Sequence, residues 1–446
     1  PSDGLRILLD TTVPVIYQSK DHLLKARRQF QKGVGNLLKQ SLSVRDPLTE
    51  TELINFFIAY QGFNDRDLQI QIARLYERAC PSLLYMAPHC SAPARPEKTG
   101  RVKIGFISRF LFNHSVALSA RGLMAELSTE KFEKYAFCVQ PVMEDHVSVL
   151  VRQAVDCTIL LPGDLALARE RIAEERLDIL VYLDIGMEPF TYFLAFARLA
   201  PVQCVFPGHP VTTGISAVDY FFSSAALEPV GAAGHYSERL VRFKHLPTYY
   251  YRPGIPASTK SFQEFGLDEE RAIYLCPQTL FKFHPEFDDV MARILRADPK
   301  GEVVLVEGIE PHWTRLLKDR FERSIPDVAA RVRFLPRMSG EDFLRLLAIA
   351  DVVLDTIHFS GGTTSLMSLG MGTPVVALPG QFMRGRVTYA CYKQMGMMDC
   401  VAKSLAQYVK IAVRLGTDRA FREATKQKIL ARNRVLYENH AVVREY

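Results

Sequence analysis

The stretch FSGGTTSLMSLGMGTPVVALPG, residues 359–380, follows one apolar run, ADVVLDT, and ends in a second, PVVALPG. Each run has a short, continuously apolar centre, VVL and VVAL, which is typical of strands buried on both faces of a parallel sheet. Between them, Gly361 and Gly362 free the backbone for a tight turn, and Thr363 and Thr364 open a short predicted helix. A strand, a turn, a helix and a second strand form one unit of an α/β fold.

The start of that predicted helix is a candidate phosphate site. A helix N-terminus offers unpaired N–H groups and a partial positive charge, worth about 0.3–2 kcal/mol to a bound anion. Glycines at 361 and 362 let a phosphate approach the backbone, and the hydroxyls of Thr363 and Thr364 add donors. An ordinary capped turn is the alternative, because the pattern matches neither standard glycine-rich phosphate motif. Its place after a strand favours a diphosphate cradle.

Working outward, the same alternation of apolar runs and helical segments fills two successive stretches of the chain. We predict an N-terminal Rossmann-like domain at 99–252 and a C-terminal Rossmann-like, nucleotide-sugar-binding domain at 253–410, with a ligand cleft between them. Residues 1–98 show helical periodicity, and residues 411–446 predict C-terminal helices, including one long amphipathic helix, that pack back across both domains. The segment 88–100, rich in proline and polar residues, is the best linker.

Composition narrows the functional class. The chain has 446 residues, of which 48% are apolar and 23% charged, which fits two or three globular domains. Its net charge of +6 suits small anionic ligands and is too weak and dispersed to indicate nucleic-acid binding. The eight cysteines lack metal-site spacing and predict reduced thiols. Without a long apolar run or a signal-peptide pattern, we expect a soluble cytoplasmic protein with no membrane insertion.

The loop after the strand YLCP carries a second candidate group. In YLCPQTLFKFHPEF, Lys282 lies between the strand and a helix that we expect to begin near Pro285. A lysine there can neutralise a departing diphosphate without a metal ion, although most lysines are simply solvated. Gln278 follows the strand directly and can bind a ligand edge or close the turn.

Two further strand ends carry polar residues. In FPGHPVTTG, His209 could bind a sugar, orient an acceptor or relay a proton, and Thr212 and Thr213 could contact an anion or sugar hydroxyls. A capping loop is the alternative. In ISRFLFNHSV, Asn113 and His114 follow the first strand, where a ligand contact and a structural role are equally open.

The carboxylates give no metal signal. Asp184 follows the strand ILVYL at the cleft end and is a candidate base, whereas Asp178 precedes that strand and is expected to be structural. Neither a carboxylate pair nor a DxD motif directly follows a predicted strand, so we expect no metal and no cofactor besides the donor substrate.

Together these stretches resemble the O-GlcNAc transferase and SPINDLY-like family of protein glycosyltransferases, glycosyltransferase family 41, as a bacterial member. The motifs VKIGFISRFLFNHS, LAPVQCVFPGHPVTTGISAVDY, QTLFKFHP, GGTTSLMSLGMGTPVVALPG and RGRV occur in the family's order across about three hundred residues. The resemblance implies a GT-B fold and inverting, metal-independent transfer of a GlcNAc- or glucose-type sugar from a nucleotide donor, UDP-linked, to Ser, Thr or Asn of a protein or peptide. The N-terminal helices would be the remnant or cap of a tetratricopeptide-type array and could also mediate oligomerisation.

The resemblance also suggests residue roles. Lys282 is similar to the family's essential lysine on the donor diphosphate, and Thr363 and Thr364 to its threonine pair on the phosphates. Gln278 resembles the donor-side glutamine, His114 the cleft histidine after the first strand, and His209 a Gly-His-Pro loop of the related cytoplasmic N-glycosyltransferases.

Several positions depart from the family pattern. Gly362 and Met367 stand where the animal enzymes have a histidine and a ribose-binding aspartate, and Phe343 stands where they have a base-contacting histidine. The interval from Gln278 to Lys282 is one residue longer. The choice between UDP and GDP, the sugar and the general base therefore stay open. A nucleotide-sugar epimerase, a small-molecule or lipid glycosyltransferase and a non-catalytic scaffold are the alternatives.

Overall fold

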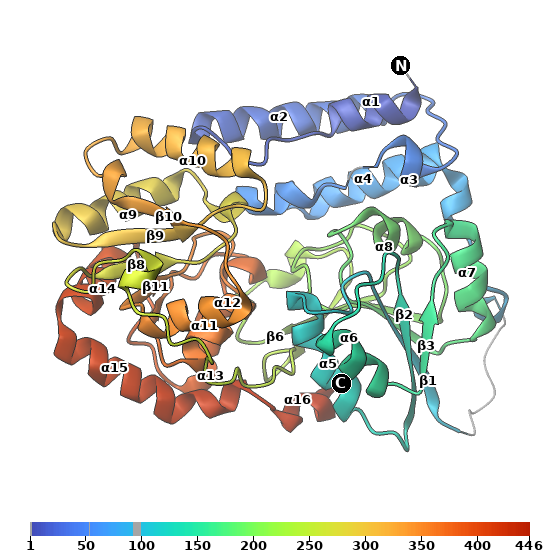
Figure 1. Cartoon of the computed structure of the whole chain (residues 1–446). Coiled ribbons are helices and arrows are strands. Elements are labelled where there is room, and N and C mark those ends of the chain that lie inside the picture. The colour runs from blue at the N-terminus through green and yellow to red at the C-terminus, as the bar shows by residue number, and fades with distance from the viewer. Residues whose placement is uncertain (1, 53, 92–99) are drawn as a thin grey trace.

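A computed structural model describes residues 2–52, 54–91 and 100–446. Two parallel sheets stand side by side, with the N-terminal helices above both (Figure 1). The predicted α/β class is confirmed. Most of the predicted linker, residues 92–99, lies outside the described residues.

The first sheet has seven parallel strands in the order β3-β2-β1-β4-β5-β6-β7. Because the order reverses between β1 and β4, the carboxyl ends of these two strands flank a topological switch point, where open α/β sheets bind ligands. The elements are β1 (Val102–Ser108), α5 (Ser115–Glu126), β2 (Phe132–Cys138), α6 (His146–Gln153), β3 (Cys157–Leu160), α7 (Leu165–Glu174), β4 (Ile179–Tyr182), α8 (Pro189–Leu194), β5 (Val202–Val205), β6 (Tyr220–Ser224), η4 (Ala232–His235) and β7 (Arg239–Phe243).

The second sheet has five parallel strands in the order β10-β9-β8-β11-β12. Its switch point lies between β8 and β11, which are the strands before the Lys282 loop and before the glycine-threonine turn. The elements are η5 (Gln263–Phe265), β8 (Ile273–Cys276), η6 (Leu280–Lys282), α9 (Glu286–Ala297), β9 (Glu302–Val306), α10 (Pro311–Ser324), η7 (Ala329–Arg331), β10 (Val332–Leu335), α11 (Gly340–Ile349), β11 (Val352–Leu354), α12 (Thr363–Gly370), β12 (Val375–Val376), η8 (Met383–Gly385) and α13 (Val387–Met395).

The N-terminal helices form a layer that contacts both halves (Figure 1). Arg320 of α10 donates to the carbonyl of Tyr17, and Ser216 of the first half donates to Glu77. The helical periodicity predicted for residues 1–98 does not give α-helix throughout, because the run FFIAYQ forms a 3-10 turn, η1. The elements are α1 (Asp3–Asp10), α2 (Lys20–Leu37), α3 (Pro47–Glu50), η1 (Phe56–Gln61), α4 (Arg66–Ala79), η2 (Pro81–Leu83) and η3 (Pro88–Cys90).

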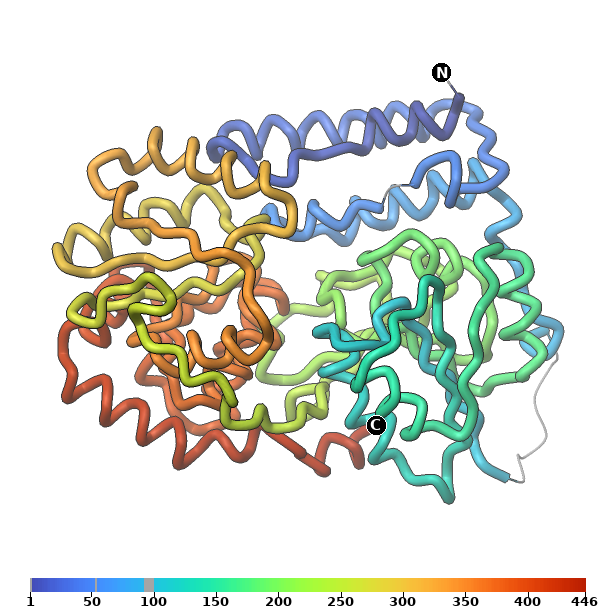
Figure 2. The backbone as a smooth tube through the Cα atoms, in the orientation of Figure 1, coloured from blue at the N-terminus to red at the C-terminus, as the bar shows by residue number. Residues whose placement is uncertain are grey.

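The C-terminal segment runs along the edge opposite that layer and returns to the first half (Figure 2). It comprises α14 (Leu405–Thr417), α15 (Arg419–Arg432), η9 (Asn433–Leu436) and α16 (His440–Glu445). The single long helix predicted here is therefore broken at η9, where the buried Asn433 donates to the carbonyl of Leu369. No helix in the described ranges combines the length and apolar character needed to cross a bilayer.

Candidate functional site: a cavity between the two sheets

A cavity of about 360 Å³ lies between the carboxyl ends of the two sheets. Its walls come from loops after β1 and β5, from loops after β8 and β11, and from η1 of the N-terminal layer. The polar residues in the lining include His114, His209, Gln278, Lys282, Ser360, Gly362, Thr363 and Thr364. Residues from distant parts of the sequence meet here because parallel sheets place their functional loops at one edge.

Lys282 is held at the centre of the second half's wall. Its Nζ donates to Oε1 of Gln278 at 2.8 Å and to the carbonyl oxygen of Ser360 at 3.1 Å. It also lies 4.9 Å from the centre of the Phe359 ring. Burial lowers the pKa of Lys282 to about 8, against the opposing effect of the Asp355 carboxylate. The ammonium is thus positioned by neutral partners and retains its charge at neutral pH.

The glycine-threonine turn stands against this lysine. Nε2 of Gln278 donates to Oγ1 of Thr364 at 2.8 Å, so one amide links the Lys282 loop to the first turn of α12. The backbone N–H of Gly361 donates to Oδ1 of Asp355 at 2.7 Å. A Cβ at Gly361 would lie 2.6 Å from both Nε2 of Gln278 and Oγ1 of Thr364, so the position requires glycine. Gly361 therefore does not line the cavity, but its lack of a side chain allows Gln278 and Thr364 to pack close to the turn.

Gly362 is the N-cap of α12, and within this described helix no side chain caps the N-terminus. Gly362, Thr363 and Thr364, at this end of the helix, line the cavity. This arrangement leaves a partial positive charge facing the space beside Lys282.

Both predicted cavity histidines are neutral at physiological pH. Burial lowers the pKa of His209 to about 3 and that of His114 to about 4. Nδ1 of His114 accepts the N–H of Val116 and caps α5, which leaves Nε2 as its remaining polar atom. His209 stacks on Phe56 at 5.0 Å between ring centres.

Thr212 and Thr213 do not join this group. Both hydroxyls donate to the buried carboxylate of Glu238, and the N–H of Thr213 donates to the same group at 2.7 Å. Neither threonine lines the cavity between the sheets, so the expected sugar or anion contact is replaced by an internal carboxylate cap. No local pattern indicates that Thr213 has a partner 25 positions further along the chain.

The remaining candidates also lie outside the cavity lining. Asp184 is fully buried, and its Oδ2 accepts from Ser108 Oγ at 2.8 Å and from the N–H of Arg109 at 3.0 Å. Burial, followed by the charge of Glu188, raises the pKa of Asp184 to about 7. Asp178 accepts the N–H of Lys103 at the opposite end of the sheet, consistent with a structural role. The N–H of Asn113 donates to Asp145.

An aromatic wall from the N-terminal layer completes the cavity. Tyr60 stacks on Phe359 at 4.4 Å and meets Phe281 at 4.7 Å, and Phe56 meets Phe281 at 5.6 Å. Sequence reasoning missed this contribution, although the run INFFIAYQ carries an unusual density of aromatic residues. The wall is anchored by Asp65, which pairs with Arg27 and Arg384.

The model for glycosyl transferase family 41 matches residues 70–251 and 255–443, most of the chain. The chain belongs to glycosyl transferase family 41. It is 28% identical over 351 residues to the Arabidopsis thaliana protein named probable UDP-N-acetylglucosamine–peptide N-acetylglucosaminyltransferase SPINDLY. That alignment covers 73% of this chain and 36% of the relative, so the chain spans about a third of that protein's length.

Solved structures share the fold of this chain. A mutant O-GlcNAc transferase from Thermobaculum terrenum superposes with a TM-score of 0.73 at 25% identity, covering 96% of this chain and 78% of that one. A sucrose-phosphate synthase from Thermosynechococcus elongatus shares the fold alone, with a TM-score of 0.53 at 12% identity, covering 77% and 97% of the two chains. The GT-B architecture expected of family 41 is confirmed.

Proposed function

We propose that this family 41 chain is an inverting protein glycosyltransferase that moves GlcNAc, or a glucose-type sugar, from a UDP-linked donor to Ser, Thr or Asn of a polypeptide. One observation carries the proposal: Lys282 is held by Gln278 beside the uncapped start of α12, inside a cavity between two GT-B halves. The activities named for SPINDLY and for the Thermobaculum enzyme support the sugar and acceptor classes.

The chemistry is a single displacement at the anomeric carbon. The acceptor oxygen or amide nitrogen forms a bond to that carbon on the face opposite the diphosphate, and the bond from the carbon to the diphosphate oxygen breaks. The nucleoside diphosphate departs toward Lys282 and the N-terminus of α12, whose positive charges stabilise the negative charge that develops. Nothing in this scheme requires a metal ion. The acceptor proton leaves to a phosphate oxygen of the donor.

The titratable side chains near the cavity are poorly suited to accept the acceptor's proton as a general base. Asp184 is buried away from the cavity lining, and the cavity histidines have pKa values well below neutrality because they are buried. His114 retains Nε2 and His209 borders the cavity, so we assign both histidines to positioning the sugar and the acceptor. Binding and orientation then supply most of the rate acceleration.

The identity of the nucleobase in the sugar donor is the open part of the proposal. Met367 and Phe343 pack partly buried against the apolar core, so neither offers the polar contact that the animal relatives have. We infer that UDP is held chiefly through its diphosphate. A screen with UDP, GDP, CMP and ADP tests this, because a nucleotide at 100 times its dissociation constant adds about 2.7 kcal/mol of stability.

The decisive experiment compares Lys282→Ala with Lys300→Ala, an exposed lysine of the same half. We expect Lys282→Ala to keep the fold and to lose about 100- to 1000-fold in kcat, as with other losses of charge stabilisation. Lys300→Ala should transfer sugar normally. Near-normal turnover by Lys282→Ala would contradict the proposal. Rearranged sugar released without an acceptor would indicate an epimerase, and the absence of any nucleotide shift would indicate a scaffold.

A further inference from the structure

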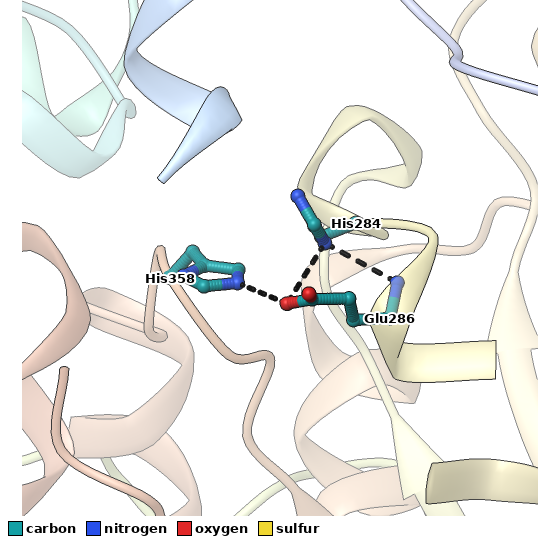
Figure 3. Close-up of side chains that lie close together, drawn as sticks. All are labelled: His284, Glu286 and His358. Atoms are coloured by element: carbon teal, nitrogen blue, oxygen red, sulfur yellow. Dashed lines mark hydrogen bonds and ion pairs between the residues drawn. The ribbon is translucent and has the colours of Figure 1, made fainter. Parts of the chain in front are cut away.

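We propose that His284, Glu286 and His358 form a binding site for one divalent transition-metal ion of the zinc class, outside the transfer cavity. The three side chains converge from two loops of the second half (Figure 3). His284 and Glu286 stand at the start of α9, and His358 comes from the loop after β11. The inference does not depend on the proposed reaction, since none of the three lines the transfer cavity.

The distances fit a small ion. One ligand atom from each residue lies within 4.8 Å of the others. Oε2 of Glu286 is 3.0 Å from Nε2 of His358 and 3.7 Å from Nδ1 of His284. Zinc binds nitrogen and oxygen at about 2.0–2.1 Å, and neighbouring ligands of such a tetrahedron are therefore about 3.3 Å apart. The two separations from Glu286 bracket that value, and the ligand nitrogens of His284 and His358 lie within 4.8 Å of each other.

The types of ligand atom determine which metal ions the site prefers. Two imidazoles and one carboxylate suit zinc, cobalt or nickel, whereas magnesium and calcium prefer oxygen ligands alone. Glu286 and His358 are each about a third exposed, which gives water access to a fourth position.

The fold holds the ligands in place without the ion. His358 adopts a left-handed backbone conformation with φ of +69°, which is uncommon for a residue other than glycine. Its ring packs against Gly62 of the N-terminal layer, where a Cβ would lie 2.8 Å from Nδ1. The N–H of Glu286 donates to Nδ1 of His284 at 3.2 Å, a long hydrogen bond that orients the ring and that a bound ion would replace.

An ion here would tie together the two loops that hold Lys282. His284 follows Lys282 by two positions, and His358 precedes Ser360, whose carbonyl accepts from Lys282, by two positions. The ion therefore acts as a structural clamp on the catalytic lysine's surroundings and takes no part in bond making.

Lys20 competes with the ion for the carboxylate. Its ammonium pairs with Oε1 of Glu286, but the Lys20 side chain is 60% exposed and such exposed pairs contribute only about 0–1 kcal/mol. The lysine can therefore turn into solvent when an ion binds. Removing its charge in Lys20→Gln should tighten metal binding several-fold.

The test uses the full chain after treatment with a chelator. Cobalt(II) titration should give the visible absorption of four-coordinate cobalt at one equivalent, and zinc should compete it away. His358→Ala and Glu286→Gln should each weaken binding by more than about 100-fold, since even loss of a group supporting a ligand costs 10–100-fold. His312→Ala, an exposed histidine of the same half, is the matched control and should bind as the wild type does.

Thermal unfolding with and without zinc gives a second readout. Zinc should raise the melting temperature of wild type and His312→Ala, and it should leave Glu286→Gln unchanged. Equal binding by all variants, a thiolate-to-cobalt absorption band, or no binding by the wild type would each overturn the site. Circular dichroism without metal shows whether a variant has folded, and Glu286→Gln, which keeps the side-chain shape, provides the test if His358→Ala has not.

Discussion

The strongest structural prediction concerns Asp65, which joins the N-terminal layer to the second half of the molecule. Its Oδ1 lies 2.6 Å from Nη1 of Arg27 and its Oδ2 lies 3.0 Å from Nη2 of Arg384. The Asp65 side chain is 0% exposed, and those of Arg27 and Arg384 are 6% and 4% exposed. Asp65→Asn keeps the shape of the side chain but leaves two buried guanidinium groups without a counter-charge.

The expected cost follows from that burial. Removing one partner of a buried ion pair destabilises a protein by about 3–5 kcal/mol, because the other charge stays desolvated. Unfolding a chain of 446 residues at about 2.1 cal/mol/K per residue changes the entropy by about 0.9 kcal/mol/K. We therefore expect Asp65→Asn to lower the melting temperature by about 3–5 °C if the chain unfolds as one unit.

Denaturant unfolding of Asp65→Asn and Asp67→Asn measures this effect. Asp67 is an exposed acid in the first turn of α4, the helix that Asp65 precedes, so its variant controls for the loss of one negative charge. A destabilisation of Asp65→Asn within about 0.5 kcal/mol of the control would refute the reasoning, because that is the usual range for surface substitutions.

Three further predictions address the cavity and its surroundings. Gly361→Ala should weaken UDP binding by more than about tenfold, equivalent to 1.4 kcal/mol, because the added Cβ would lie within 2.6 Å of three polar side chains. Titration calorimetry measures this effect, with Gly254→Ala as the control because a Cβ at that position has no atom within 4 Å. Burial raises the pKa of Asp184 to about 7, so the native state binds this proton more tightly than the unfolded state does. The free energy of unfolding should therefore fall as pH rises from about 4 to above 7. Unfolding measured at several pH values should show a flatter dependence for Asp184→Asn, and an unchanged slope would contradict the argument. Phe56→Ala should admit water beside His209 and raise the low pKa of its imidazole, which an NMR titration detects, whereas an unchanged value would show that this ring does not seal the cavity.

Much of the fold was predictable because hydrophobic periodicity and the succession of strands and helices along the chain can be recognised locally in the sequence. Short apolar runs separated by amphipathic segments give parallel strands, and parallel strands place their following loops at one edge. This rule is sufficient to predict that Lys282, Gln278 and Thr364 lie in one neighbourhood. The same rule predicts the edge of the first sheet at which Asp184 lies.

The parts that escaped prediction depend on partners distant in the sequence. Thr212 follows a strand end as a ligand-binding residue would, but its hydroxyl is used by Glu238, and no local pattern reveals that carboxylate. His284 and His358 are 74 positions apart and meet only through the second sheet. The amphipathic spacing of the N-terminal helices predicts helices without saying which surface they cover, so the contribution of Phe56 to the cavity stayed hidden.

The N-terminal layer also has a mechanical consequence. Proteins with two facing α/β halves commonly open and close about a hinge when ligands enter and leave. Here Arg320 of the second half donates a hydrogen bond to the carbonyl of Tyr17, and Ser216 of the first half donates one to Glu77. A wide opening would break either the Ser216–Glu77 contact or the Arg320–Tyr17 and Arg384–Asp65 contacts, depending on which half leaves the layer. We therefore expect the layer to resist a wide opening of the two halves.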